Sequence, residues 1–375
     1  SGAGRISRLP AGQRVPVAIP GASPVADVAT AIAAAINARP DLPVTAAAAA
    51  AVVTITARQA GLHGNAIDIR WNHYLGERLP KGVALTLVAM ANGAGEPDHA
   101  PVWAAIAAMP FSAIALGFVS NANLAAAKLQ LDDRWGPLRM LETSLFGAVP
   151  GSIGAATAFG AALNSELISI VGTGRSPSPP AEWAASFAGV VNASGAIDPA
   201  RPLQTLPLPG ILAPREDHQW DRTEREGALR DGITTTLRDG DGTVRIERAI
   251  TTFQVNAAGV EDTAFLDVET VRTLAFLRQA VRTRIATKYP RHKLADDDTR
   301  FGPGQAIVTP RIIRAELIAL FGELEERGLV ERAADFAEAL IVERNADDPN
   351  RLDALLPPDL VNQFRVFAAQ IQFRV

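Results

Sequence analysis

Strand-like and helix-like patterns alternate between residues 113 and 193, and this alternation constrains the fold more than any other feature of the chain. Short runs of aliphatic and β-branched residues predict strands, and the segments between them have the apolar spacing of helices. Strands are predicted at residues 113–119, 140–146 and 167–171, and helices at 121–132, 153–163 and 180–193. This order favours right-handed crossovers between parallel strands. The middle of the chain is therefore predicted to be α/β, with a mostly parallel sheet sandwiched by helices.

A smaller mixed unit is predicted before this region. Its expected elements are strands at residues 5–9, 14–19, 52–56, 66–69 and 83–88 and a helix at 25–37. Ser23 and Pro24 are suited to begin the helix, because proline is tolerated at the first helical position. We interpret the alanine tract at residues 46–53 as a packing segment, and the Gly/Pro-containing run at 93–97 as a boundary.

The order of elements changes again after residue 210. Segments 233–237 and 244–250 flank Asp239-Gly240-Asp241-Gly242 and predict a β-hairpin. Later elements are predicted helices at 265–289, 310–328 and 331–337 and strands at 340–343 and the C-terminus. A chain of 375 residues has room for two or three domains. We divide it into a small α+β surface domain at 1–92, the α/β domain at 93–252, and a C-terminal α+β domain at 253–375 that ends in an exchangeable strand.

The last eleven residues have the period of a half-buried strand. Gln370, Gln372 and Arg374 point to one side, and the alternate positions are apolar: Phe367, Ala369, Ile371, Phe373 and Val375. A strand with free backbone donors and acceptors can complete the sheet of a neighbouring subunit. The five apolar residues are therefore a candidate strand-exchange interface. The alternative is that the strand folds back onto its own domain.

Composition and charge argue against several classes of function. The net charge is −4, so no overall basic field attracts nucleic acid or an anionic membrane. Cysteine is absent, which excludes disulfides, thiolate nucleophiles and cysteine-bound metals, and the five histidines lack the spacing of metal ligands. The most apolar tract, at residues 46–53, is too short to span a bilayer. We expect a soluble protein used without export, with no cofactor, metal, nucleic acid or membrane insertion.

A glycine-containing loop at residues 172–175 follows a predicted strand, where a doubly wound fold would hold a phosphate. However, Ser176 and the prolines after it replace the third glycine and delay the helix, so an ordinary turn is favoured. The alternative function is an α/β enzyme, a hydrolase or nucleotide-binding protein, that uses this loop after the third central strand.

Other short motifs also have simpler interpretations. The run from Asp239 resembles a calcium loop, but its sixth position, which needs glycine for a sharp turn, is Val244, and its twelfth, which needs a bidentate glutamate, is Ile250. The hairpin turn is therefore favoured. Ser152 is placed to cap a helix. Asp98 and His99 are neighbours and point in different directions. We find no convergent catalytic constellation and predict no active site.

A charged loop joins the two long helices predicted in the last domain. Its basic residues come first and its acidic residues second: Arg291, His292, Lys293, Asp296, Asp297 and Asp298. This separation of charge suits a self-complementary contact between copies of the chain. An anion site at the three basic residues and a solvated loop are the alternatives.

Six further runs lie from the middle domain onward: IDPARPLQTLP (197–207), KYPRHKL (288–294), RFGPGQ (300–305), VERN (342–345), NRLD (350–353) and PPDLVNQ (357–363). Together they resemble the contractile tail sheath protein of Mu-like bacteriophages. The resemblance is most specific in the last third of the chain.

The resemblance implies a structural subunit and not an enzyme, with a middle domain of subtilisin-like fold that lacks subtilisin's catalytic motifs. It implies six-fold rings of this chain, stacked helically around a tail tube, that contract to drive the tube through the host envelope. The implied partners are further copies, the tail tube protein, the baseplate and the tail terminator. The implied location is the virion tail, after assembly in the host cytoplasm. An extended arm that precedes the first domain in the family is expected to be missing here.

Overall fold

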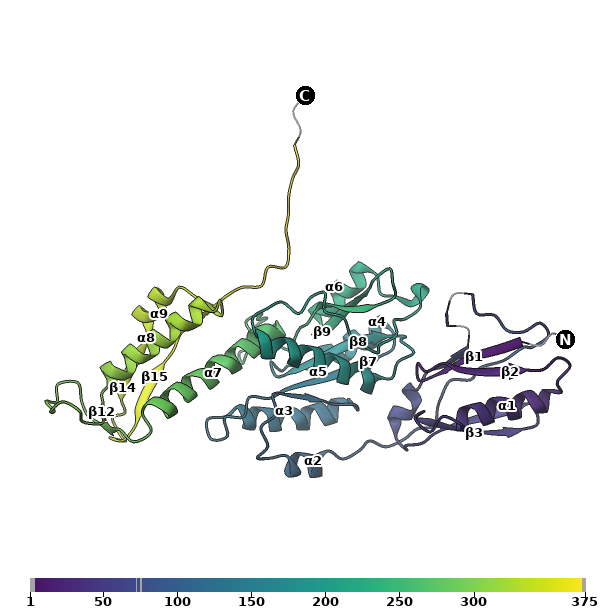
Figure 1. Cartoon of the computed structure of the whole chain (residues 1–375), viewed down its shortest axis with the longest axis horizontal. Helices are drawn as coiled ribbons and strands as arrows, with labels where there is room; N and C mark the ends of the chain where they lie inside the picture. The colour runs from purple at the N-terminus through teal and green to yellow at the C-terminus, as the bar shows by residue number, and fades with distance from the viewer. Residues whose placement is uncertain (1–3, 72, 75, 373–375) are drawn as a thin grey trace. The chain divides into compact units, whose positions relative to one another are not determined.

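The computed structural model describes residues 4–71, 73–74 and 76–372 (Figure 1). Contacts within the chain divide it into two compact units. The first unit comprises residues 1–192 and 203–268, and the second comprises residues 193–202 and 269–375. The chain therefore passes between the units at 192/193, 202/203 and 268/269. The domain boundaries at 92/93 and 252/253 stay predictions.

The start of the first unit is a small α+β structure. Strands β2 (Val15–Ile19), β1 (Gly4–Pro10) and β5 (Ile69–Trp71) form an antiparallel sheet in that order. Helix α1 (Val25–Asn37) has the predicted bounds, but its N-cap is Pro24 and not Ser23, whose hydroxyl donates to the Pro20 carbonyl at 2.8 Å. The helix packs against β2 and a hairpin of β3 (Val44–Ala49) and β4 (Val52–Ala57). One apolar cluster joins these elements through Val17, Ile32, Ile36, Leu42 and Val44.

Two strand predictions in this part need correction. The strand expected at 66–69 lies at 69–71, because residues 62–66 form the 3-10 helix η1 (Leu62–Ala66). The strand expected at 83–88 is absent from the described residues. Val83 and Leu85 instead pack on the apolar cluster from a segment that no neighbouring strand pairs with. Apolar alternation predicts a buried face, whereas a strand also needs a hydrogen-bonding partner.

The five-stranded sheet of the first unit confirms the predicted mostly parallel arrangement. Its order is β10-β9-β8-β7-β6, and only the β9–β10 pair is antiparallel. The strands are β6 (Ala113–Ala115), β7 (Ser144–Pro150), β8 (Ile168–Gly174), β9 (Ile233–Arg238) and β10 (Val244–Arg248). The turn at residues 239–243 is closed by the Asp239 amide, which donates to the Thr243 carbonyl at 2.9 Å. The predicted hairpin is therefore confirmed.

Helices cover both faces of this sheet, as predicted. The helical segments are α2 (Ala100–Ala105), α3 (Asn121–Trp135), α4 (Ile153–Ala161), α5 (Pro180–Ile197), η2 (Glu216–His218) and α6 (Arg222–Arg230). Trp183 and Phe187 of α5 pack against Val171 of β8. Helix α4 approaches Ile233, which pairs with Ile170, the residue before Val171. Because successive side chains of a strand point to opposite faces, α4 and α5 lie on opposite sides.

Several elements of the middle region differ from the prediction. β6 ends at Ala115 and not at residue 119. β7 begins at Ser144 and not at Met140, whose φ of 53° places it in a turn. Helices α2 and α6 were not predicted. Helix α6 begins with a capping box, in which Asp221 and Glu224 each bind the other's backbone amide. The spacing of an acidic cap and a glutamate three residues later was a readable signal for this helix.

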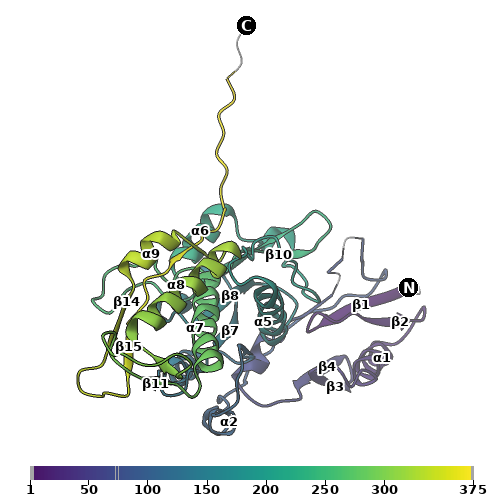
Figure 2. The same cartoon turned by 60° about the vertical axis from the view of Figure 1, so that its left-hand side comes forward.

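The second unit is built around two long helices, α7 (Val268–Lys288) and α8 (Pro310–Glu326) (Figure 2). Thr309 caps α8 by accepting the Ile312 amide at 3.4 Å. The rings of Phe321 in α8 and Phe336 in α9 (Ala333–Ala339) stack with centroids 3.5 Å apart. Short two-stranded sheets complete the unit: β11 (Lys293–Leu294) with β12 (Ile307–Val308), β13 (Val330–Glu331) with β16 (Asp359–Leu360), and β14 (Ile341–Arg344) with β15 (Leu352–Leu355).

A buried arginine fixes the loop before β6. Arg134 of α3 is 1% exposed and donates to the carbonyls of Ile106 at 3.1 Å, Ala107 at 3.3 Å and Met109 at 2.5 Å. Its Nε donates to the Thr143 hydroxyl at 3.1 Å. Burial, and then the nearby charge of Arg139, lowers the pKa of Arg134. The guanidinium thereby satisfies backbone carbonyls that would otherwise be buried without partners.

We expect Arg134→Ala to lower the free energy of unfolding of the first unit by about 3 kcal/mol, because it leaves buried carbonyls unpaired. The matched control is Lys128→Ala on the same helix, whose exposed ion pair with Asp132 contributes about 0.5 kcal/mol. All five tryptophans lie in the first unit, so tryptophan fluorescence in urea measures its unfolding. Equal losses in the two variants would contradict the role of Arg134.

Candidate functional site

The C-terminal segment leaves the second unit as an extended chain (Figures 1 and 2). Its described residues, 361–372, belong to no helix or strand, so the predicted terminal strand is not formed within this chain. Every residue from 366 to 372 is exposed, including Phe367 at 79% and Ile371 at 94%. Ala369 is exposed as well, whereas Phe373 and Val375 lie outside the described residues. We call residues 366–375 the arm.

The missing strand has a physical reason. A strand is defined by hydrogen bonds to a second strand, and the sequence period sets only which side chains share a face. The arm has that period but meets no strand in the described part of its own chain. The alternative in which the segment folds back onto its own domain is therefore not seen for residues 366–372.

The sheet of β14 and β15 has one covered face and one open face. Cross-strand pairing puts Ile341 opposite Leu355 on one face and Arg344 opposite Leu352 on the other. Leu352, together with Val342, packs on the core of the second unit. Ile341 and Leu355 on the other face are 50% and 62% exposed. Within the described residues the sheet has two strands, so each outer edge has backbone groups without a strand partner.

The charged loop is only partly available for contacts with other molecules. Asp296 pairs with Arg344 at 3.0 Å, and Asp297 accepts the Arg311 amide at 3.0 Å. The Thr309 hydroxyl, and then the Arg311 amide, lowers the pKa of Asp297. Lys293 donates to Gln305 at 3.2 Å. The remaining predicted residues, Arg291, His292 and Asp298, are exposed, and their role between copies stays a prediction.

A buried carboxylate beside this loop was not predicted. Glu316 of α8 binds Arg284 at 2.9 Å and the Tyr289 hydroxyl at 3.0 Å, and it also pairs with Lys288. Burial raises the pKa of Glu316, but the hydrogen bonds from Lys288, Arg284 and Tyr289 outweigh it and lower the pKa below its ordinary value. This network ties α7 to α8. Its only sequence signal was an acidic residue beside Leu317 on the apolar stripe of α8.

The loop at residues 172–175 does not form a phosphate cradle. A Cβ at Gly172 would lie 2.4 Å from the indole of Trp220, so this side chain covers the backbone that a phosphate would need. The third glycine of the fingerprint is absent, and α5 begins only at Pro180. Ser152 caps α4 by accepting the Ala155 amide at 3.3 Å, as predicted. Asp98 accepts the Ala100 amide at 2.9 Å.

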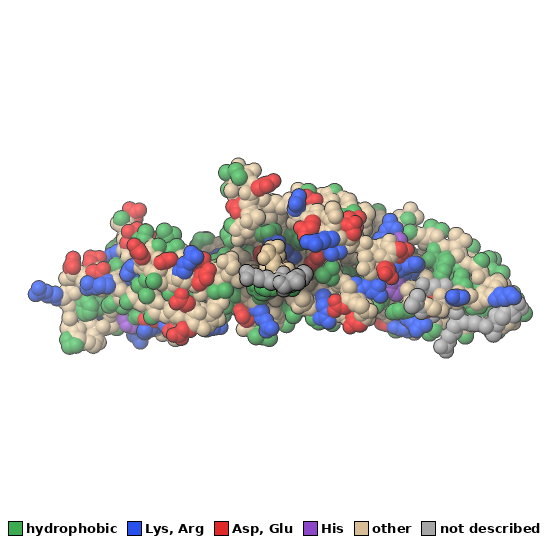
Figure 3. Space-filling view, turned by 90° about the horizontal axis from the view of Figure 1, so that it is seen from above, with side chains coloured by type: hydrophobic (Ala, Val, Ile, Leu, Met, Phe, Trp, Pro, Cys, Tyr) green, Lys and Arg blue, Asp and Glu red, His purple; other side chains and the backbone are tan. Residues whose placement is uncertain are grey.

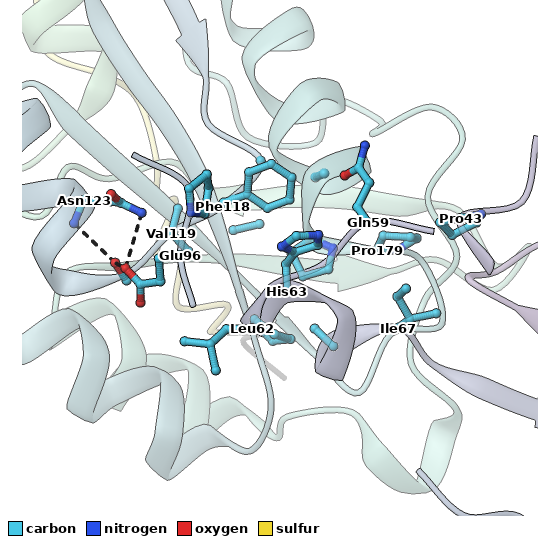
Figure 4. Close-up of a pocket in the computed structure, with 18 of the residues that line it drawn as sticks. Pro43, Gln59, Leu62, His63, Ile67, Glu96, Phe118, Val119, Asn123 and Pro179 are labelled. Carbon is cyan, nitrogen blue, oxygen red and sulfur yellow. Dashed lines mark hydrogen bonds between the residues drawn. The ribbon is translucent and has the colours of Figure 1, made fainter. Parts of the chain in front are cut away.

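An unpredicted pocket of about 330 Å³ lies in the first unit at the carboxyl ends of the parallel strands (Figure 4). Leu62, Phe118 and Pro179 line it, and the His63 ring lies 4.3 Å from the Phe118 ring. Glu96 accepts the Ser120 hydroxyl at 2.5 Å. A hydrolytic triad requires the histidine between the carboxylate and the serine. Here Glu96 holds the serine directly, and neither His63 nitrogen has a hydrogen-bond partner among the described residues.

Family models match most of the chain. The phage tail sheath protein central domain matches residues 92–252, and the phage tail sheath C-terminal domain matches residues 260–374. The Mu-like prophage FluMu tail sheath protein of Haemophilus influenzae is 42% identical over 371 residues, which are 99% of this chain and 76% of that protein. The chain belongs to the phage tail sheath family. The resemblance inferred from the sequence is confirmed, and a structural role in a phage tail sheath follows.

Solved structures of sheath proteins share the mixed α/β fold at low identity. The sheath tail protein of Desulfitobacterium hafniense has a TM-score of 0.52 at 16% identity, covering 83% of this chain and 70% of that chain. That of Listeria innocua has a TM-score of 0.52 at 14% identity, covering 83% and 67%. A chain of the anti-feeding prophage baseplate has a TM-score of 0.51 at 12% identity, covering 74% and 72%.

The surface of this sheath protein carries both signs of charge. On the face drawn in Figure 3, acidic and basic side chains are intermingled over the described residues. Exposed ion pairs such as Arg351–Asp353, at 2.6 Å, contribute to this pattern. No helix in the described chain is both long and apolar enough to cross a membrane. Because charges of both signs are intermingled, electrostatic contacts with other molecules would be local, between small patches.

Glu316→Gln tests the buried network through pH. Because the folded pKa of Glu316 is lowered, its carboxylate stabilises the fold above its ordinary pKa of 4.5, and this stability is lost as pH falls through the folded value. We expect hydrogen exchange of α7 and α8 to be faster in Glu316→Gln at pH 7, with the difference from wild type shrinking toward acid. The exposed Glu338→Gln is the control. A difference that did not depend on pH would contradict this assignment.

Gly172→Ala tests whether the Trp220 indole occupies the space over the backbone of Gly172. We expect a loss of about 2 kcal/mol in unfolding free energy, because the indole must move, and recovery when Trp220→Leu is added. Gly154→Ala is the matched control, since its Cβ would meet no atom within 4 Å and alanine favours the helix. Thermal unfolding followed by circular dichroism measures all the variants. Full stability of Gly172→Ala alone would show that the loop is open.

Proposed function

We propose that this chain is the non-catalytic subunit of a contractile tail sheath, and that its copies form six-fold rings stacked helically around a tail tube. The observation that carries the proposal is the exposed arm, with Phe367, Ala369 and Ile371 on one side and no strand partner in the described chain. A terminal strand of this kind is suited to adding to the sheet of a neighbouring copy. Phe373 and Val375 extend the same face in the sequence.

The β14–β15 sheet of a second copy is the acceptor that fits the arm best. A strand added at its edge continues both faces of the sheet. Phe367, Ala369 and Ile371 would then extend the face of Val342 and Leu352 toward the core. Gln370 and Gln372 would lie on the face of Glu343 and Asp353, where amides can donate to carboxylates.

A single arm contact is expected to be weak. Burial of Phe367 or Ile371 contributes about 1.5–3 kcal/mol each, whereas ordering the backbone costs about 1–2 kcal/mol for every residue. In a ring, each further contact becomes effectively intramolecular, so many weak contacts give a cooperative assembly. Arms that stay inserted could tether subunits while their folded units repack during contraction.

The remaining partners follow from the same proposal. The copies would enclose the tail tube protein and end at the baseplate and the tail terminator. Arg291, His292 and Asp298 are exposed residues of the charged loop that could form contacts between copies. The protein would assemble in the host cytoplasm and act in the virion tail. An enzymatic role is not proposed, because Trp220 covers the glycine loop and Glu96 holds Ser120 directly.

Serine substitutions on the two faces of the arm test the strand exchange. We expect Phe367→Ser with Ile371→Ser to abolish sheath-like tubes or to raise the concentration at which they form at least tenfold, a change of about 1.4 kcal/mol. Gln370→Ser with Gln372→Ser is the matched control on the opposite face and should assemble normally. Electron microscopy and sedimentation of the purified protein give the readout. Normal tubes from the apolar pair would refute the proposal.

A further inference from the structure

The last contact of the C-terminal segment with its own unit is an ion pair. Nη2 of Arg365 lies 3.3 Å from Oε1 of Glu269. The Glu269 side chain is 1% exposed and that of Arg365 is 16% exposed, so the pair is buried although the residues on both sides of Arg365 are exposed. A carboxylate this deeply buried needs cationic or hydrogen-bonding partners, and the segment supplies one of them.

The exposure pattern shows where the segment detaches. Val361, Gln363 and Arg365 are partly buried, and the residues between them are exposed, which is the alternation of a chain lying on a surface. The Val361 amide also donates to the Leu329 carbonyl at 3.4 Å. Phe367 should face inward by the same alternation, but it is 79% exposed. The chain therefore leaves the unit immediately after Arg365.

The other member of the pair lies on a rigid element. Glu269 is in the first turn of α7, a helix of 21 residues, and it is the residue at which the chain returns to the second unit. Its backbone carbonyl accepts the Thr273 hydroxyl at 2.8 Å. The base of the arm is thus tied to the start of a long helix and not to another loop.

We infer that Arg365 and Glu269 are positioning residues that fix the point and direction in which the arm leaves the subunit, an inference that rests on the proposed strand exchange. With the pair intact, the free tether begins at residue 366. Without it, the free segment extends back toward Val361, which adds about four residues to the ten of the arm. A longer, less directed tether lowers the effective concentration of the arm at its acceptor. The pair therefore favours assembly without contacting the neighbouring copy.

Arg365→Gln tests this inference with two readouts. We expect hydrogen exchange of residues 361–365 in the monomer to rise, and the concentration at which tubes form to rise about tenfold. The matched control is Arg332→Gln, which removes an arginine whose ion pair with Asp359, at 3.2 Å, is exposed. The control should leave both quantities within twofold of wild type. Arg365→Lys, which keeps the charge, should recover part of the assembly.

The outcomes separate this inference from the proposed function. If Phe367→Ser with Ile371→Ser stops assembly but Arg365→Gln leaves both quantities unchanged, strand exchange stands and the positioning role is overturned. Slower assembly of Arg365→Gln without faster exchange at 361–365 also overturns it, because the arm base would not have been released. If Arg365→Gln does not fold, Glu269→Gln with Arg365→Gln removes both members of the pair and must give the same two changes.

Discussion

A strand needs a second strand to satisfy its backbone, and the described residues of the arm, 366–372, have no strand partner in the described part of their own chain. Residues 366–372 are exposed along their length, and alternate positions are apolar. Within the described chain, the backbone of these residues has no strand partner, and Phe367 and Ile371 are not buried. The β14–β15 sheet has only two strands among the described residues, so the backbone groups at its outer edges also lack a strand partner. In the proposed strand exchange, association of copies would give both the arm and the sheet edge a strand partner.

The folded units are stabilised by contacts of a different kind. Arg134 binds three carbonyls and a hydroxyl within the first unit, and Glu316 binds three donors of α7 and its end within the second. Buried charges of this sort favour one packing, because any displacement leaves them without partners. Folded units of this kind with an extended arm would suit the proposed contractile sheath, in which subunits stay tethered while they repack. The Glu269–Arg365 pair lies where the rigid part ends and the arm begins.

Particular side chains occupy the places in the first unit where an α/β enzyme would hold its ligand or its catalytic serine. The first unit has an α/β sheet and a pocket at the carboxyl ends of its strands, where many enzymes bind ligands. In that pocket, however, Glu96 binds the serine that a triad would need free. Outside the pocket, Trp220 covers the glycine loop at residues 172–175. Sheath relatives share this fold at identities of 16% and below. The fold is therefore compatible with a structural role.

The sequence alone determined the features that depend on local rules. Apolar spacing set α1 and α8, the glycine turn set the β9–β10 hairpin, and the family runs identified the sheath. Only the tertiary structure decided the start of β7, the lack of a strand at 83–88, and the contacts of Arg134, Glu316 and Arg365. Each of these depends on a partner distant in sequence, such as Glu269, 96 residues from Arg365. A sequence period specifies the face that a segment can bury, whereas the three-dimensional arrangement decides what lies against that face.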